Sequence, residues 1–195
     1  MKNKVCCFTG HRPKSLPWGY NEYAGECQML KNKLFFEIES TIQKGYNHFI
    51  IGMAQGIDTY VGELLIDFKK NDTEITIEAA IPCLNQDEKW LNPAKQQYRN
   101  ILSWCDKSTV ISEQYTPFCM QKRNQYMVDQ SSRLIAVWNG KPSGTLNTIK
   151  YAKKKRNRSC DYRGLNDLCY EIKQKRYHSR FLGEHGTFLL RMYIL

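Results

Sequence analysis

The sequence has no apolar run that approaches the roughly 18 residues of a membrane-spanning helix, and its opening stretch, MKNKVCCFTG, leads directly into a strand-like segment. We therefore expect neither a membrane span nor a signal peptide and predict a soluble, cytoplasmic protein. The eight cysteines form no CxxC pair, and the histidines do not cluster with them. This spacing argues against zinc and redox sites, so we expect no bound metal and predict reduced, mostly buried thiols.

A strong positive charge is missing from most of the chain, although the formal net charge is +10. Residues 1–149 hold 17 Lys and Arg against 15 Asp and Glu, whereas residues 150–195 hold 12 against 4. A charge run of this kind is more often a solvated face than a nucleic-acid-binding surface. We therefore do not expect nucleic acid as the main partner, and DNA binding through the basic C-terminal segment stays an alternative.

What the chain does contain is a regular alternation of short apolar runs and segments with helical spacing. The predicted strands are Val5–Thr9, His48–Ile51, 75–82, 108–112 and Arg133–Trp138, and the predicted helices are 27–44, 58–70, 93–105, 118–131 and 145–154. Because the strands are apolar throughout, the alternation predicts an α/β fold with a mainly parallel sheet covered by helices on both faces.

The C-terminal segment is less regular than the rest. We predict one domain over residues 1–155, followed by a basic extension over 156–195 that is packed on the domain or partly disordered. Within the extension, the sequence predicts a helix near 165–177, and the last residues, 187–195, read as a strand or as a poorly ordered end.

Three loops that follow predicted strands contain glycine: TGHRP after the first strand, GMAQGID after the second and GKPSGT after the fifth. Ligands of such sheets bind at the carboxyl ends of the strands, so the three loops should meet at one edge. Glycines let backbone N–H groups approach a ligand closely, and the amino end of a helix attracts anions. Arg12 is suited to phosphate, and Asp58 to capping its helix or binding ribose hydroxyls.

No loop matches GxxxxGK[ST] or GxGxxG, which excludes a P-loop and a standard dinucleotide fingerprint. Four segments taken together nevertheless resemble a known family: FTGHRP with LPWGYNE, IIGMAQGIDTYVGE, IPCLNQDEKW and QKRNQYMVDQSSRLIAVWNGKPSGT. They are similar to the YpsA-like branch of the SLOG superfamily, over about residues 4–154. That superfamily also includes the DNA-processing protein DprA and the LOG-type phosphoribohydrolases.

The resemblance implies a Rossmann-like, doubly wound fold with a site for a nucleotide or nucleotide-derived ligand of the ADP-ribose or NAD kind, in a sensor or regulatory protein. It implies no certain cofactor. Trp90 is a candidate to stack on a base or, equally, a packing aromatic, and Arg123 a candidate to face the ligand. The other residues that it assigns to the ligand are Thr9, Gly10, His11, Arg12, Gly52, Met53, Ala54, Gly56, Asp58, Gly144 and Thr145, with Glu63 on the helix behind them.

The chain also departs from its relatives. LOG-type hydrolases carry PGGxGTxxE, whose acid acts on the ribosyl bond, whereas the segment here is GKPSGTLNTIKYA and supplies no carboxylate. A nucleotide-cleaving enzyme stays an alternative, with His11, Asp58 and Glu63 as its candidate acid and base groups. Superfamily relatives often self-associate, so a homo-oligomer is expected. They usually finish with a strand soon after the helix at 145–154, and here only 187–195 is available to supply it.

Overall fold

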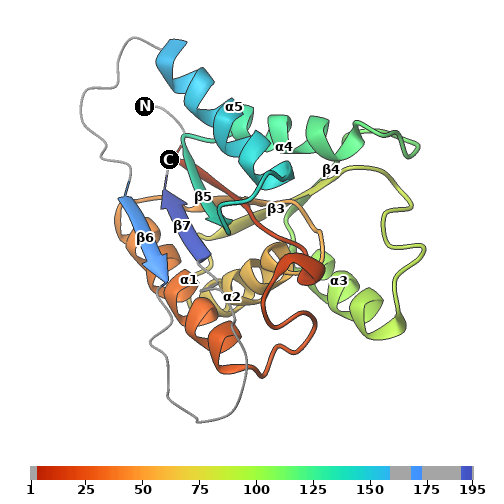
Figure 1. The fold of residues 1–195 in the computed structure, drawn as a ribbon, viewed down its shortest axis with the longest axis horizontal. Coiled ribbons are helices and arrows are strands. Elements are labelled where there is room, and N and C mark those ends of the chain that lie inside the picture. Colours follow the sequence, from red (N-terminus) through yellow and green to blue (C-terminus); the bar gives the residue numbers. More distant parts are fainter. Residues whose placement is uncertain (1–3, 159–167, 173–189, 195) are drawn as a thin grey trace.

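The computed structural model describes residues 4–158, 168–172 and 190–194. The described strands form one sheet in the order β4-β3-β2-β1-β5-β7-β6, with helices on both faces (Figure 1). The strands are β1 (Val5–Thr9), β2 (His48–Ile51), β3 (Thr76–Ile81), β4 (Lys107–Val110), β5 (Arg133–Trp138), β6 (Leu168–Ile172) and β7 (Leu190–Ile194). The helices are the 3-10 helix η1 (Pro13–Ser15) and α1 (Gly25–Gln43), α2 (Ile57–Asn71), α3 (Asn92–Trp104), α4 (Cys119–Gln130) and α5 (Gly144–Arg158). The predicted Rossmann-like α/β fold is confirmed.

The first five strands run parallel, and β1 lies between β2 and β5. The chain winds outward from β1 through β2 and β3 to β4, and then places β5 on the other side of β1. The strand order therefore reverses between β1 and β5. In open α/β sheets this reversal creates a crevice beyond the carboxyl ends of the strands, where ligands bind.

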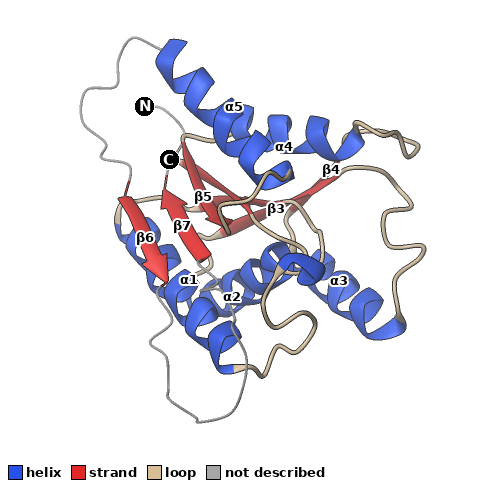
Figure 2. Ribbon diagram, in the orientation of Figure 1, coloured by secondary structure: helices blue, strands red, loops and turns tan. Residues whose placement is uncertain are grey.

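Two helical layers enclose the sheet, with α1, α2 and α3 on one face and α4 and α5 on the other (Figure 2). On the first face, Leu30, Leu34 and Ile38 of α1 recur at helical spacing and are fully buried. On the second face, Met127 of α4 and Ile149 of α5 pack in a separate apolar cluster. Burial on both faces explains why the central strands read as continuous apolar runs.

The strand β4 is an exception to the prediction that the strands are apolar throughout. It lies at the edge of the sheet, where Lys107, Ser108 and Val110 are exposed. It also occupies Lys107–Val110 instead of 108–112. A strand with one neighbour is buried less than a central one, and a lysine on it is a common protection against pairing with other chains.

In the C-terminal segment, one predicted element is wrong and another is confirmed. The helix predicted near 165–177 is wrong, because its described part is the strand β6, which pairs antiparallel with β7. Its apolar residues recur at every second position, a strand pattern that is ambiguous in so short a run. The final strand expected within 187–195 is β7, which pairs antiparallel with β5.

The cysteines with described side chains agree with the predicted reduced thiols. Cys6, Cys27, Cys83 and Cys119 are free and buried, Cys105 is free and half-buried, and Cys7 is also buried. Burial also raises the pKa of Cys105 to about 12. Thiols in such surroundings are poor nucleophiles, so they belong to the packing of the protein.

Candidate ligand-binding site

A cavity of about 280 Å³ lies at the carboxyl ends of the strands, beside the point where the strand order reverses. The loop after β1 and the amino ends of α2, α4 and α5 form its walls. The three loops that the sequence singled out thus meet at one edge of the sheet. The lining residues are Thr9, Gly10, His11, Arg12, Ser15, Ala54, Asp58, Met120, Arg123, Asn124, Ser143, Gly144 and Thr145.

The turn between β2 and α2 has glycine at two crowded positions. At Gly52, a Cβ atom would lie 1.5 Å from Nη1 of Arg123, so any other residue there would displace that guanidinium. Gly56 has a φ of 92° just before α2, and a Cβ there would lie 2.5 Å from the carbonyl oxygen of His11. Met53 between them is a non-glycine residue with a φ of 58°, an uncommon conformation that concentrates at functional sites.

A buried ion pair joins this turn to α4. Nη1 of Arg123 lies 3.2 Å from Oδ2 of Asp58, and the two side chains are only 7% and 8% exposed. Nη1 also donates to the carbonyl oxygen of Gly52, and Oδ2 accepts the backbone N–H of Ala54 at 3.1 Å. Arg123 and Asp58, both assigned to the ligand on sequence grounds, therefore also hold each other in place.

The guanidinium of Arg123 lines the cavity, while one of its donors, Nε, is buried and has no hydrogen-bond partner in the structure. Buried polar groups are nearly always paired, and an arginine can only donate. Because Nε is closed off from solvent, an anion in the cavity would be attracted by the charge of the guanidinium as a whole and not by this donor.

His11 connects the loops after β1 and β5. Its Nε2 lies 3.1 Å from the backbone nitrogen of Asn139, which can only donate, so Nε2 accepts and the proton of the neutral ring is on Nδ1. Burial also lowers the pKa of His11, which favours the neutral ring. His11 can therefore donate through Nδ1 but is poorly suited to supply a positive charge.

The amino end of α5 closes the cavity on the side of the second helical layer. The hydroxyl of Ser143 accepts the backbone N–H of Leu146 at 3.3 Å, which caps the helix. Gly144 and Thr145 occupy its first turn, where backbone N–H groups have no acceptor inside the helix. These groups, together with the partial positive charge of the helix end, favour an anion in the cavity.

Arg12 lies at the mouth of the cavity. Its side chain is exposed, and its Nη2 contacts the sulfur of Met120 at 3.5 Å. Within the described residues it has no carboxylate partner. The charge of Arg123 is balanced by Asp58, so Arg12 supplies the net positive charge of the site.

The cavity continues past Arg12 into an open groove of about 1290 Å³ between the segment 12–23 and α3. Side-chain amides are frequent in its lining: Gln28, Gln55, Gln86, Gln96, Gln97 and Asn100. Trp90 also lines the groove, although its ring meets Tyr98 edge-to-face at 5.6 Å and packs on the core.

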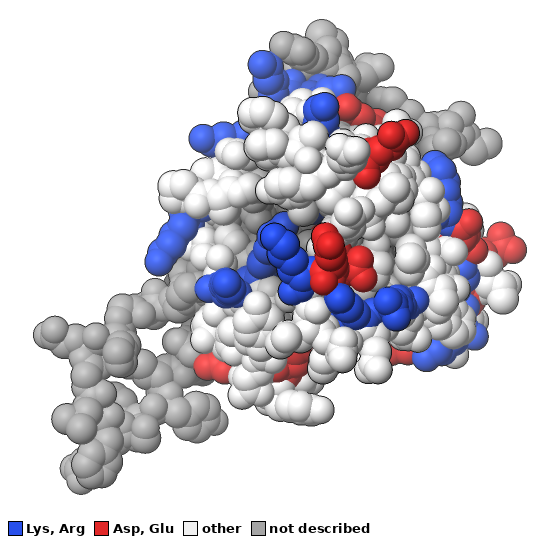
Figure 3. Space-filling model, turned by 90° about the vertical axis from the view of Figure 1, so that its right-hand side faces the viewer, with Lys and Arg blue, Asp and Glu red and all other residues white. Residues whose placement is uncertain are grey.

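On the face drawn in Figure 3, Lys and Arg side chains form a band that acidic side chains interrupt. The groove therefore offers both donors and acceptors and is not uniformly basic.

Glu63 lies in the groove, away from the cavity. Its Oε1 accepts from Nε2 of Gln97 at 2.6 Å, and its Oε2 lies 3.5 Å from Nζ of Lys31. Lys31 in turn pairs with Glu22 at 2.7 Å. Both carboxylates proposed as acid or base groups, Asp58 and Glu63, are thus already engaged in ion pairs.

The structure places the residues predicted for the ligand in three groups. Nine line the cavity: Thr9, Gly10, His11, Arg12, Ala54, Asp58, Arg123, Gly144 and Thr145. Gly56, Glu63 and Trp90 line the groove. Gly52 and Met53 line neither, because they lie behind Arg123 and Gln86, whose Nε2 donates to the Met53 carbonyl at 2.8 Å.

Four further residues line the cavity without having been predicted as ligand contacts: Ser15, Met120, Asn124 and Ser143. Ser143 could have been predicted from the sequence, because serine directly before a helix commonly caps it. Asn124 lies one residue after Arg123 on the predicted helix. Ser15 and Met120 have no signal in the sequence, since only the packing of η1 and α4 brings them to the cavity.

The described residues add no metal-binding cluster to this site. They contain no group of three or more His, Cys, Asp or Glu side chains that could hold a metal ion. No helix in the described part of the chain is both long and apolar enough to cross a membrane.

Comparisons with known proteins agree with this architecture. The family model YpsA, described as the YspA SLOG family, matches residues 6–167. A Bacillus subtilis (strain 168) protein named "Uncharacterized SPbeta prophage-derived protein YoqJ" is 35% identical over 138 residues, which cover 64% of this chain and 81% of that protein.

More distant relatives cover more of the chain. A UPF0398 protein of Bacillus cereus (strain ATCC 14579) is 26% identical over 156 residues, 78% of this chain and 84% of its own length. A UPF0398 protein of Bacillus thuringiensis (strain Al Hakam) is 25% identical over 162 residues, 82% of this chain and 87% of its own length. With the family match spanning most of the sheet and its loops, the chain belongs to the YpsA family of SLOG proteins.

Proposed function

We propose that this protein binds a nucleotide or nucleotide-derived ligand, of the ADP-ribose or NAD kind, and acts as a cytoplasmic sensor or regulatory protein. The ligand's phosphate occupies the cavity at the carboxyl edge of the sheet. The observation that carries the proposal is the meeting of Arg12, Arg123 and the amino end of α5 around one cavity at the carboxyl edge of the sheet. A phosphate group would accept hydrogen bonds there and balance the positive charge.

The surroundings of Arg123 favour an anion by several independent contributions. The amino end of α5 is worth about 0.3–1 kcal/mol to a nearby anion and up to ~2 kcal/mol in a partly buried site. Hydrogen bonds from Arg12 to a phosphate would contribute about 1.5–3 kcal/mol each. The Nδ1–H of neutral His11 offers a further donor without adding charge.

The volumes of the two spaces favour a ligand that extends beyond its phosphate. Small-molecule pockets typically measure ~300–1,000 Å³, so a cavity of about 280 Å³ is suited to a phosphate with its sugar. The rest of the ligand would continue past Arg12 into the groove. There the side-chain amides can pair with the edge of a base, and the exposed part of Trp90 can contact its ring.

The state of the acidic residues supports binding over cleavage. Hydrolysis of a glycosidic bond usually needs two carboxylates that are free to act as acid and base or nucleophile. Asp58 is paired with Arg123, and Glu63 is held by Lys31 and Gln97. We therefore favour a binding protein over a nucleotide-cleaving enzyme.

Isothermal titration calorimetry against ADP-ribose, NAD, common nucleotides and inorganic phosphate tests the proposal. We expect at least one nucleotide to bind below millimolar concentration and Arg12→Ala to weaken its binding by tenfold or more, because a charged hydrogen bond is worth about 1.5–3 kcal/mol. Arg99→Ala is the matched control, since Arg99 is an exposed arginine of α3 that lines neither the cavity nor the groove.

Two results would overturn the proposal. Absence of submillimolar binding for every nucleotide tested would remove its basis, and equal losses for Arg12→Ala and Arg99→Ala would show that the cavity is not the site. Chromatography of nucleotides incubated with the protein separates binding from cleavage. Turnover that Asp58→Asn abolishes would favour the enzyme.

A further inference from the structure

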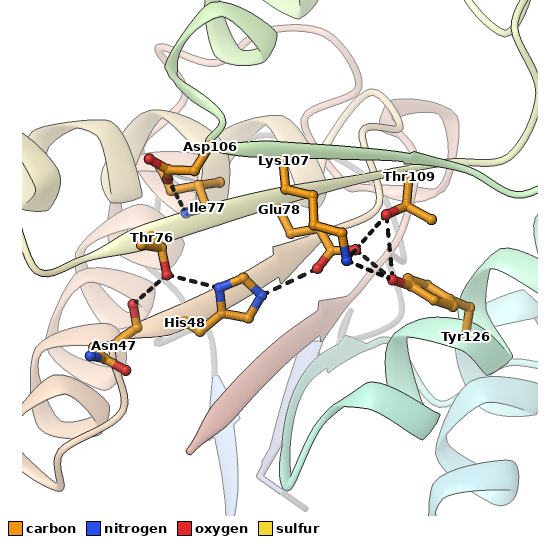
Figure 4. A network of polar contacts seen from close by, with 9 residues as sticks. All are labelled: Asn47, His48, Thr76, Ile77, Glu78, Asp106, Lys107, Thr109 and Tyr126. Atoms are coloured by element: carbon orange, nitrogen blue, oxygen red, sulfur yellow. Dashed lines mark hydrogen bonds and ion pairs between the residues drawn. The ribbon is translucent and has the colours of Figure 1, made fainter. Parts of the chain in front are cut away.

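A buried carboxylate lies in the middle of β3, on the sheet face that α4 covers (Figure 4). Glu78 is only 3% exposed in its side chain, although the three residues that follow it in its strand are apolar. Its Oε1 accepts from the hydroxyl of Tyr126 at 2.6 Å and from the hydroxyl of Thr109 at 2.7 Å. Tyr126 lies on α4 and Thr109 on β4, so one oxygen atom joins three elements.

Two cationic or ionisable side chains complete the surroundings of Glu78. Nζ of Lys107 lies 3.2 Å from Oε1, and Nε2 of His48 lies 3.2 Å from Oε2. The other ring nitrogen of His48 lies 2.8 Å from the hydroxyl of Thr76. A buried carboxylate is tolerated only when it is paired and hydrogen-bonded in this way. The contacts therefore hold β2, β4 and α4 in one arrangement around β3.

Tyr126 is the residue through which this network reaches the candidate site. It lies three positions after Arg123 on α4, and residues three apart share a helix face. The hydrogen bonds that α4 makes through Asn124 and Asp129 go to Thr148 and Tyr151 of α5. In the described residues, Tyr126 thus ties α4 to the sheet, while Arg123 ties it to the turn after β2.

We infer that Tyr126, held by Glu78, is a positioning residue of the anion site: it sets the placement of α4 from which Arg123 lines the cavity. The inference rests on the proposed function, because it assumes that Arg123 contacts the phosphate. Tyr126 itself does not line the cavity. Its effect on affinity must therefore pass through α4, as coupling between packed elements does.

Tyr126→Phe is the direct test, because it removes only the hydroxyl. We expect the dissociation constant of inorganic phosphate, measured by calorimetry, to rise about threefold to tenfold, the range typical of coupling through packed elements. Tyr151→Phe is the matched control. It deletes a hydroxyl that also donates to a carboxylate, in an exposed contact at 3.0 Å from Asp129 of α4. It should leave phosphate affinity unchanged.

A double-mutant cycle distinguishes positioning from general loosening of the fold. When Arg123 is replaced by Gln, adding Tyr126→Phe should weaken phosphate binding no further, because the group that Tyr126 positions is gone. Independent effects of the two changes would overturn the inference. If Arg123→Gln does not fold, Arg123→Lys replaces it in the cycle; Tyr126→Phe should then weaken phosphate binding less than it does in the wild-type protein, because the guanidinium is gone but a charge remains.

The outcomes separate this inference from the proposed function. If the wild-type protein binds neither phosphate nor any nucleotide, both fail. If it binds, and Arg12→Ala weakens binding while Tyr126→Phe does not, the proposed function stands and the positioning role of Tyr126 is wrong. Equal weakening by Tyr126→Phe and Tyr151→Phe would likewise assign Tyr126 a general structural role.

Discussion

Replacing Asp58 by Asn would leave the positive charge of Arg123 buried without its partner. The two side chains are 8% and 7% exposed, so solvent replaces the lost carboxylate only in part. Removing one member of a buried pair typically costs about 3–5 kcal/mol. Asn keeps an oxygen that can accept the backbone N–H of Ala54, so we expect the low end, about 3 kcal/mol. A domain with a total stability of ~5–15 kcal/mol should still fold after such a loss.

Urea denaturation at pH 7 measures this change, through the transition midpoint at constant slope. Asp129→Asn is the matched control, because it neutralises a carboxylate whose partner, Lys155, is half exposed. An exposed pair contributes little, so the control should leave the midpoint almost unchanged. A loss below about 1 kcal/mol for Asp58→Asn would refute the reasoning that Arg123 depends on Asp58 for its charge balance.

The same variant links stability to the candidate site. Inorganic phosphate should stabilise Asp58→Asn more than the wild-type protein, because a bound anion would replace the missing negative charge beside Arg123. Thermal unfolding with and without phosphate measures the difference. Equal stabilisation of the two proteins would show that the anion and Arg123 are not in contact.

Two further predictions concern the fold around the site. Gly56→Ala should destabilise the protein by about 1–3 kcal/mol in thermal unfolding, because Gly56 has a φ of 92° and a Cβ would meet the His11 carbonyl; Gly25→Ala, with open space around it, should be neutral or slightly stabilising. Burial raises the pKa of Glu78, but the bonds from Tyr126 and Thr109 and the pair with Lys107 outweigh it, so the pKa lies below its usual 4.5. As the pH falls below 4.5, the carboxyl group of Glu78 is therefore protonated in the unfolded chain before it is protonated in the folded protein. The stability that Glu78 contributes is present above pH 4.5 and is lost as the pH falls below it. Urea midpoints should show the wild-type protein losing more stability than Glu78→Gln in this range, and parallel losses would contradict the assignment.

As far as α5, local patterns in the sequence were enough to predict the elements and their order. Three strands were predicted with their observed bounds, Val5–Thr9, His48–Ile51 and Arg133–Trp138. The five helices α1 to α5 were predicted within a few residues of theirs. Apolar periodicity is a local property that burial of a sheet or helix face imposes directly. Because parallel strands bring their carboxyl ends to one edge, the meeting of the three glycine loops also followed from the sequence.

Contacts between distant residues were decided only by the tertiary structure. Arg123 and Asp58 are 65 positions apart and each resembles a ligand contact, yet packing pairs them with each other in the cavity wall. Glu78, within the run ITIEAAIP, reads as an isolated acid in a core strand, and the folded chain surrounds it with Tyr126, Thr109, Lys107 and His48. The strand β6 formed where a helix was predicted, because its pairing partner lies about twenty residues away. The period of apolar residues specifies which surface a segment buries, whereas the partner of a buried charge or of a strand edge depends on what the rest of the chain brings beside it.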